Sequence, residues 1–426
     1  MLLQFSVENF RSFKHKTVLS MEASADKNLL DNIVQIKKEK VLKAAAIFGA
    51  NAAGKSNLFL ALTAAILMVR VSNFRQIGEP LVQITPFLFD KESALKPTSF
   101  EFVFTVNDKK YVYGFSATTR KICTEYLYVY NSARPTTIFE RDESAKVPYR
   151  FTDYAIQKKL KPLTERNTEN KLFLATASSW NAEETKEPML WFMQGINTYD
   201  PRYEEKALNI AGNLYENDVD NSLRNFTINL LKEADINISD YNFTSKKIPF
   251  MPSGPFAPKQ EVGTDQQIQG KVYEITAFHI IEDENGHNEK YSLGMHSESQ
   301  GTRNLFFMAP IIKRAFETGE TVCIDEFDTS LHPTLLVYIV GLFNNPYINK
   351  KNAQLIISSH TMSLLDLNEM RRDQIYFIEK NQQTGISDLY SLDEFSPRTR
   401  EDVRKAYLLG RYGSIPEVGA GGSLWG

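Results

Sequence analysis

Cysteine is scarce in this sequence. The 426 residues include two cysteines, Cys123 and Cys323, which lie far apart in the chain. A disulfide scaffold is therefore excluded, and a reducing cytoplasm is the expected compartment. Neither sign of charge dominates, because 49 lysines and arginines stand against 52 acidic residues, for a net charge of −3. A chain this balanced is not a bulk polycation, so any contact with nucleic acid must come from a local patch.

Long apolar runs are also missing. The longest, from Leu58 to Val69, is about a dozen residues, well short of the roughly 18 to 20 that a helix needs to span a bilayer. Glu8 and Arg11 interrupt the N-terminus, which therefore does not resemble a secretory signal. No internal repeat and no sustained heptad pattern is present. We expect a cytoplasmic globular protein of two or three domains, with no membrane contact and no long coiled-coil arm.

A phosphate-binding pattern stands near the N-terminus. Residues Gly49 to Ser56 fit G-x-x-x-x-G-K-[ST], between an apolar run predicted as a buried strand (Ala44 to Phe48) and a predicted helix after Asn57. The glycines permit a tight turn whose backbone N–H groups point at phosphate oxygens, and the helix start adds its dipole. Lys55 would reach the β- and γ-phosphates, and Ser56 would ligate Mg²⁺. The alternative is a glycine-rich turn that binds no ligand.

An acidic pair closes a second apolar strand. Residues Thr321 to Ile324 predict a buried strand, and Asp325 and Glu326 follow it directly. At the tip of a strand beside the phosphate loop, Asp325 is suited to hold Mg²⁺ and Glu326 to orient and deprotonate the attacking water. General-base assistance of this kind contributes about 10² to 10⁴ in rate. The alternative is an exposed strand end capped by acids.

Three further segments suit the same chemistry. Ser299 and Gly301 precede a strongly apolar helix and supply a hydroxyl, a flexible glycine and a helix start, all of which favour an anion. Residues 328–333 form a loop directly after the acidic pair, which could touch a partner subunit. His360 ends another apolar strand and could contact the γ-phosphate or the attacking water. The alternatives are an ordinary helix cap at Ser299 and a structural role for His360.

The remaining pattern predicts three domains. Residues 1–150 contain the phosphate loop and alternating apolar residues typical of an antiparallel β subdomain, as at Phe100 to Phe104 and Tyr111 to Phe115. Residues 151–270 are predicted as an insertion, helical over 181–245 and ending in an extended loop with a proline at every third position from Pro249 to Pro258. Residues 271–426 form a second lobe in which helices and buried strands alternate.

Together these motifs resemble the ATPase head of the ABC, SMC and OLD-type class. Asn9 to Phe13 resembles the opening of RecF- and Rad50-like heads, and Gly49 to Asn57 matches their Walker A motif. The segment 299–302 is similar to a degenerate signature motif, with S-x-G-T in place of L-S-G-G-Q. Asp325 and Glu326 match Walker B, residues 328–333 look like the D-loop, and His360 looks like the switch histidine.

The resemblance implies an α/β fold of the ABC type, a mixed β-sheet with helices and an antiparallel β subdomain, and a set of site residues. Catalysis falls to Glu326 and His360, and Ser299 and Gly301 would act on the ATP of a second copy. Mg²⁺ would be held by Ser56, Asp325 and Gln83, the last as the glutamine loop ahead of Pro86. The implied ATP contacts are Arg11, Gly49, Asn51, Ala53, Gly54, Lys55, Ser56 and Asn57.

The tail Gly410 to Pro416 is similar to small bacterial ATPases of the RloA and abortive-infection type, which work with a separately encoded effector, often a nuclease, in phage defence. This resemblance implies a dimer or larger homo-oligomer with ATP between heads. Few residues follow His360, and no metal-ligand cluster stands out, so we expect the nuclease or toxin on another chain. Two alternatives stay open: a DNA-binding repair ATPase of RecF type, using the basic stretch 398–411, and a nucleotide-gated scaffold with weak turnover.

Overall fold

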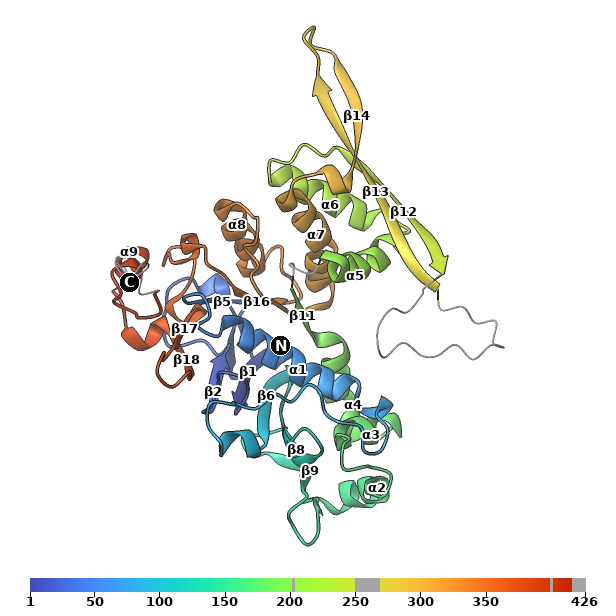
Figure 1. Cartoon of the computed structure of the whole chain (residues 1–426), viewed down its shortest axis with the longest axis vertical. Coiled ribbons are helices and arrows are strands. Elements are labelled where there is room, and N and C mark those ends of the chain that lie inside the picture. The colour runs from blue at the N-terminus through green and yellow to red at the C-terminus, as the bar shows by residue number, and fades with distance from the viewer. Residues whose placement is uncertain (201–203, 250–268, 399–400, 416–426) are drawn as a thin grey trace, which may run out of the picture. The chain divides into compact units, whose positions relative to one another are not determined.

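A computed structural model gives the architecture of the chain (Figure 1). The structure describes residues 1–200, 204–249, 269–398 and 401–415, so the predicted proline-rich loop beyond Pro249 lies outside the described residues. The chain forms two compact units. The first contains residues 1–200, 315–328 and 333–426, and the second contains residues 201–314 and 329–332.

The described chain contains runs of consecutive strands separated by helices. The helices are α1 (Lys55–Arg70), α2 (Tyr154–Thr164), α3 (Phe173–Ser179), α4 (Glu183–Leu190), α5 (Glu204–Glu216), α6 (Ser222–Glu233), α7 (Gln300–Thr318), α8 (Pro333–Asn344) and α9 (Val403–Leu408). The strands are β1 (Leu2–Glu8), β2 (Thr17–Ser20), β3 (Ile33–Ile36), β4 (Glu39–Leu42), β5 (Ala44–Phe48), β6 (Thr98–Val106), β7 (Lys109–Ala117), β8 (Ile122–Tyr130), β9 (Thr136–Asp142), β10 (Tyr149–Arg150), β11 (Ile196–Tyr199), β12 (Asp240–Pro249), β13 (Gln269–Glu282), β14 (Asn288–Gly294), β15 (Thr321–Ile324), β16 (Gln354–Ser358), β17 (Ile375–Lys380) and β18 (Ser387–Ser391).

The first unit is built on a six-stranded sheet in the order β11-β15-β16-β5-β17-β18. Its strands are parallel except β18, which pairs with β17 in the antiparallel sense. Every residue of β5, β15 and β16 is buried, which explains why these segments are almost continuously apolar. Because the strands are parallel, the loops that follow β5, β15 and β16 meet at one edge of the sheet.

The first unit also contains a seven-stranded antiparallel sheet, in the order β10-β9-β8-β7-β6-β1-β2, and a two-stranded sheet of β3 and β4. The predicted alternation is confirmed, because β6 and β7 pair with Phe104 opposite Tyr111 and Phe100 opposite Phe115. One face of this sheet packs on aromatic residues before β11, where the rings of Phe104 and Trp191 stack 4.0 Å apart. A single apolar core joins this face to α1 and the parallel sheet. The predicted α/β class with an antiparallel β subdomain is confirmed.

The second unit combines a three-stranded sheet, in the order β12-β13-β14, with the helices α5, α6 and most of α7. The ring of Tyr215 on α5 stacks on Phe306 of α7 at 4.9 Å, and its hydroxyl donates to the Phe306 carbonyl at 2.7 Å. Within this unit the β13–β14 hairpin extends past the helices (Figure 1). No helix in the described part of the chain is long and apolar enough to cross a bilayer.

The predicted insertion at 151–270 does not coincide with the second unit. Helices α2, α3 and α4 belong to the first unit, and β11 pairs in parallel with β15 in its central sheet. The prediction of helix throughout 181–245 was wrong at β11 and at β12. Both errors have a physical cause, because these strands are held by partners distant in sequence, Thr321–Ile324 for β11 and β13 for β12.

Candidate nucleotide-binding site

The loop between β5 and α1 has the backbone expected of a phosphate loop. It leaves the buried strand at Gly49, passes through left-handed conformations at Ala52 (φ 63°) and Gly54 (φ 120°), and enters α1 at Lys55. A Cβ on Gly54 would lie 2.6 Å from the Ser387 hydroxyl oxygen, so both the angle and the close approach require glycine. The Lys55 ammonium lies inside the loop, where it donates to the carbonyls of Gly49 (2.7 Å) and Ala50 (3.1 Å).

The charges of three carboxylates act on the Lys55 ammonium. Burial lowers the pKa of Lys55 below its usual value of 10.5, and the negative charges of Asp325, Glu326 and Asp328 oppose this shift. Charges act in this way only over short distances. The predicted acidic pair after β15 therefore lies within electrostatic range of the Lys55 ammonium, as the parallel order of β15, β16 and β5 requires.

Ser358, at the end of β16, holds the acidic pair in place. Its hydroxyl donates to Asp325 Oδ1 at 2.6 Å and accepts the backbone N–H of Glu326 at 2.7 Å. Asp325 is buried, and Glu326 has a left-handed backbone (φ 50°) that turns the chain at the strand tip. This serine was not among the predicted site residues. The available signal was a hydroxyl at the end of the strand that neighbours β15.

Asp328 fixes the loop that carries the predicted switch histidine. Its Oδ2 accepts the hydroxyls of Ser359 (3.0 Å) and Thr361 (2.9 Å) and the backbone N–H of His360 (2.7 Å). The His360 side chain is exposed. Asp328 was predicted to lie in a loop that could touch a partner subunit, and its carboxylate has three hydrogen-bond partners in its own chain.

Ser12 connects the N-terminal motif to the phosphate loop. Asn57 of α1 donates to the Ser12 hydroxyl oxygen at 2.8 Å. Ser387 of β18 donates its hydroxyl to the Ala53 carbonyl at 2.6 Å and its backbone N–H to the Ser12 carbonyl at 2.8 Å. Asn57 and Ala53, both predicted ATP contacts, are thereby tied to segments far away in sequence. Ser12 lies within the motif from Asn9 to Phe13 but was not predicted as a site residue, and neither was Ser387.

Arg11 and Asn51 are both exposed. The Arg11 backbone is left-handed (φ 49°), and its N–H donates to the Thr85 carbonyl at 2.9 Å. Since Arg11 directly precedes Ser12, its backbone lies beside the start of α1. Asn51 lies in the phosphate loop itself, and Ser56 occupies the second position of α1. These predicted ATP contacts therefore lie in the phosphate loop, at the start of α1, or next to the residue that contacts it.

Gln83 does not join this group. Its Oε1 accepts from Arg75 at 3.1 Å, and the same guanidinium contacts the carbonyl and sulfur of Met68. Met68 lies near the end of α1, about 20 Å along the helix axis from Lys55. The prediction of Gln83 as a Mg²⁺ ligand is therefore not supported by its place in this structure. Gln83 was predicted only from its position ahead of Pro86, and no local sequence pattern marks it as a metal ligand.

Ser299 and Gly301 lie in the second unit. The Ser299 hydroxyl accepts the backbone N–H of Thr302 at 3.1 Å, so the serine acts as a cap at the start of α7. A Cβ on Gly301 would collide with the Ser330 carbonyl, and Asn304 donates to the Thr329 carbonyl at 2.9 Å. The predicted signature segment is therefore packed against residues 329–330 of the loop that follows the acidic pair.

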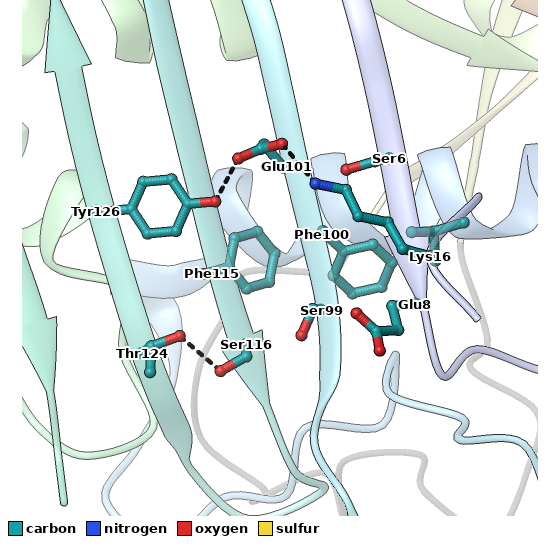
Figure 2. A pocket seen from close by; sticks show the side chains of 11 residues that line it. Ser6, Glu8, Lys16, Ser99, Phe100, Glu101, Phe115, Ser116, Thr124 and Tyr126 are labelled. Atoms are coloured by element: carbon teal, nitrogen blue, oxygen red, sulfur yellow. Dashed lines mark hydrogen bonds and ion pairs between the residues drawn. The ribbon is translucent and has the colours of Figure 1, made fainter. Parts of the chain in front are cut away.

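A separate polar pocket lies on the outer face of the antiparallel sheet (Figure 2). Its volume is about 180 Å³. Glu101 accepts from Tyr126 at 2.5 Å and from Lys16 at 3.2 Å, and the hydroxyls of Ser116 and Thr124 lie 2.7 Å apart. None of the predicted site residues lines this pocket.

A family model described as "AAA domain, putative AbiEii toxin, Type IV TA system" matches residues 44–178 and 194–366. These ranges include the phosphate loop, the acidic pair and His360. No curated protein matches the chain.

Solved structures similar to the chain include two Smc heads and one ABC ATPase. A Smc head domain with an extended coiled coil, bound to the C-terminal domain of ScpA from Pyrococcus furiosus, is 13% identical, covers 93% of this chain and 97% of its own, and has a TM-score of 0.39. A Smc head bound to the C-terminal winged-helix domain of ScpA is 14% identical over 92% and 97%, with a TM-score of 0.36. The cbiO1 protein from Clostridium perfringens, part of the ABC transporter complex cbiONQ, is 10% identical over 97% and 98%, with a TM-score of 0.29.

Proposed function

The chain belongs to this family of AAA domains and is a P-loop ATPase, and from that premise we propose that it hydrolyses ATP at sites shared between two copies of itself. The nucleotide-dependent association would control a separately encoded effector, a nuclease or toxin, in defence against phage. The observation that carries this proposal is the parallel strand order β15-β16-β5, which brings the acidic pair after β15 and the phosphate loop after β5 to the same edge of the sheet.

The residues around the phosphate loop suit Mg²⁺ and a triphosphate. A serine hydroxyl on Ser56 and a carboxylate on Asp325 are the hard oxygen donors that Mg²⁺ prefers, and Ser358 orients that carboxylate through its hydroxyl. When bound, the metal would neutralise charge that develops on the phosphate oxygens. The backbone N–H groups of residues 50–55 would cradle the phosphates, and Lys55 would exchange its two carbonyl partners for phosphate oxygens.

Glu326 supplies the base in this proposal. It follows Asp325 directly, and its backbone N–H is held by Ser358, so its position is tied to that of the proposed metal ligand. It would orient the attacking water and take its proton. His360 would contact the γ-phosphate or that water from the neighbouring loop, whose backbone Asp328 holds.

Ser299 and Gly301 would complete the site of a second copy. Ser299 is exposed and begins a helix of nineteen residues, whose N-terminal dipole favours an anion. The first unit already contains one phosphate loop. The start of α7 would therefore bind the nucleotide of another subunit.

The experiment that tests the proposed chemistry compares wild-type protein with Glu326→Gln and Lys55→Ala. Glu326→Gln should bind ATP with Mg²⁺ normally, lose about 10²- to 10⁴-fold in turnover and stay assembled in ATP. Lys55→Ala should lose nucleotide binding. Glu369→Gln, at an exposed position outside the site, is the matched control and should behave as wild type. Turnover of Glu326→Gln at the wild-type rate would contradict the assignment of the base.

Direct DNA binding is the alternative outcome. Arg404 and Lys405 on α9 are exposed, but Arg411 pairs with Glu401 at 2.7 Å, which lowers the positive charge of this stretch. Salt-sensitive DNA binding that stimulates ATP hydrolysis without another protein would favour the repair function over control of an effector.

A further inference from the structure

The tail that follows α9 is held in an unusual backbone conformation. Gly410 (φ 77°), Gly413 (φ 65°) and Ser414 (φ 61°) all have left-handed backbone angles, which residues other than glycine rarely adopt. Ser414 is nevertheless a serine, and it is 2% exposed. A left-handed serine in a buried position persists only where its surroundings hold it there.

Aromatic side chains anchor this tail to the parallel sheet. The ring of Phe377 on β17 stacks with Tyr407 at 5.3 Å and with Tyr412 at 5.8 Å. The Tyr390 hydroxyl donates to the Tyr412 carbonyl at 2.7 Å, and the Tyr407 hydroxyl donates to the Ser414 carbonyl at 3.0 Å. The backbone on both sides of Gly413 is therefore fixed from β17, β18 and α9.

Ser414 ends up beside the first glycine of the phosphate loop. Its hydroxyl donates to the Ile378 carbonyl, and a Cβ on Gly49 would lie 3.2 Å from the same hydroxyl oxygen. The Cβ would also collide with the Ile378 carbonyl. Gly49, Ile378 and Ser414 thus meet at one point, where the phosphate loop begins.

The pairing of β5 with β17 shows how the hydrogen bond from Ser414 to Ile378 affects the start of the phosphate loop. The two strands pair from Ala46 opposite Ile375 to Phe48 opposite Phe377, and the pairing stops there. The next carbonyl on β17 belongs to Ile378 and would accept from the chain after β5 if the ladder continued. Ser414 takes that carbonyl instead, so β5 is released at Gly49 and the chain turns into the phosphate loop.

We propose that Ser414 is a positioning residue for ATP binding, because its hydrogen bond to the Ile378 carbonyl sets the point at which the phosphate loop leaves β5. The proposal rests on the ATPase function and extends it to a motif with no role in the chemistry. The phosphate loop would then be held at both ends, by Ser414 near Gly49 and by Ser387 at the Ala53 carbonyl.

The test is the dissociation constant of the full chain for a fluorescent ATP analogue with Mg²⁺. Ser414→Gly suits the left-handed backbone and removes the CH2OH side chain together with its hydrogen bond to Ile378, so it should bind about three- to tenfold more weakly, as expected for one lost hydrogen bond. Ser414→Ala should bind at least as weakly. Ser396→Gly is the matched control, because Ser396 is also left-handed (φ 48°) but exposed, and it should bind as wild type.

Steady-state kinetics separates positioning from general stability. Ser414→Gly should raise KM while kcat at saturating ATP stays within about twofold of wild type, because bound phosphate reforms the loop. Wild-type affinity in Ser414→Gly would overturn the proposal, and so would a Ser414→Gly protein that fails to fold, since the hydroxyl would then support the whole domain. If wild-type protein itself fails to bind the analogue, the ATPase function fails instead.

Discussion

Two carboxylates, Asp325 and Asp328, organise the edge of the parallel sheet where the predicted catalytic residues lie. Asp325 and Asp328 are three positions apart in the sequence, yet each binds a different part of the chain around the end of β16, Asp325 through Ser358 and Asp328 through residues 359–361. The acidic loop and the histidine loop are therefore one hydrogen-bonded assembly, in which a change at either carboxylate is felt at the other loop.

Asp328→Ala should reduce ATP turnover about tenfold with a much smaller change in KM. Removing the carboxylate leaves the His360 N–H and two hydroxyls without their charged acceptor, each bond being worth about 1.5 to 3 kcal/mol. The measurement is steady-state hydrolysis together with the thermal unfolding midpoint, which should fall by several degrees. Asp388→Ala, at an exposed position on β18, is the control. A wild-type kcat in Asp328→Ala would show that the loop of His360 does not need the hydrogen bonds to this carboxylate.

The buried ammonium of Lys55 predicts how binding depends on pH. Burial lowers its pKa below 10.5, so free protein loses this proton at a lower pH than an ordinary lysine would. Below the lowered pKa the ammonium is present and ATP binding is unaffected. Above it, binding must take up a proton and weakens as pH rises. Calorimetry from about pH 7 to about pH 10, in buffers of different ionisation enthalpy, should detect this uptake. A dissociation constant that stays flat across that range would refute it.

Some residues of the candidate site are predictable from the local sequence, and others are not. Lys55, Asp325 and Glu326 stand next to apolar runs whose strand and helix forms are legible from a few residues. Ser358 and Asp328 act through partners more than thirty positions away, and no local pattern marks such bonds. For Gln83, position along the chain suggested a role as a Mg²⁺ ligand, which its contact with Arg75 does not support.

At the scale of elements, α1 is tied at its far end to β11. Arg70, the last residue of α1, donates to the carbonyls of Phe192 (2.6 Å) and Ile196 (2.5 Å) and to Asn197 Oδ1 (2.9 Å). Because β11 pairs with β15, the helix that begins at the phosphate loop is connected to the strand that ends at Asp325. The four-residue strand β11 was missed from the sequence because it is short, half polar and flanked by helices.

Arg70→Lys should lower the stability of the first unit by about 2 kcal/mol, because a lysine cannot reproduce the forked geometry of three donated bonds. Urea unfolding gives the change directly. Arg120→Lys, at an exposed turn between β7 and β8, makes the same chemical change outside any such network and should leave stability within about 0.5 kcal/mol. Equal stability of Arg70→Lys and Arg120→Lys would rule out the proposed tie.

At the scale of the whole molecule, the family match confirms the relationship to abortive-infection ATPases, and the sheets confirm the α/β class. The division into units was less predictable. The chain enters the second unit after β11 and leaves it within α7, then enters it again for residues 329–332. Such repeated crossings have no signature in composition, since both units mix helices with strands. They do place Ser299 and Gly301 in a different unit from Lys55.

The central claim is that ATP is hydrolysed between two copies, and subunit mixing tests it most directly. Lys55→Ala removes the phosphate loop's cation, whereas Ser299→Asp keeps a good helix cap at α7 and sets a negative charge against the phosphate of the other copy. Each variant alone should be nearly inactive. An equal mixture should regain about a quarter of wild-type ATP turnover, because half of the dimers are mixed and each mixed dimer has one intact site of two. A mixture that associates without regaining activity, or a Ser299→Asp protein that is fully active alone, would contradict the account.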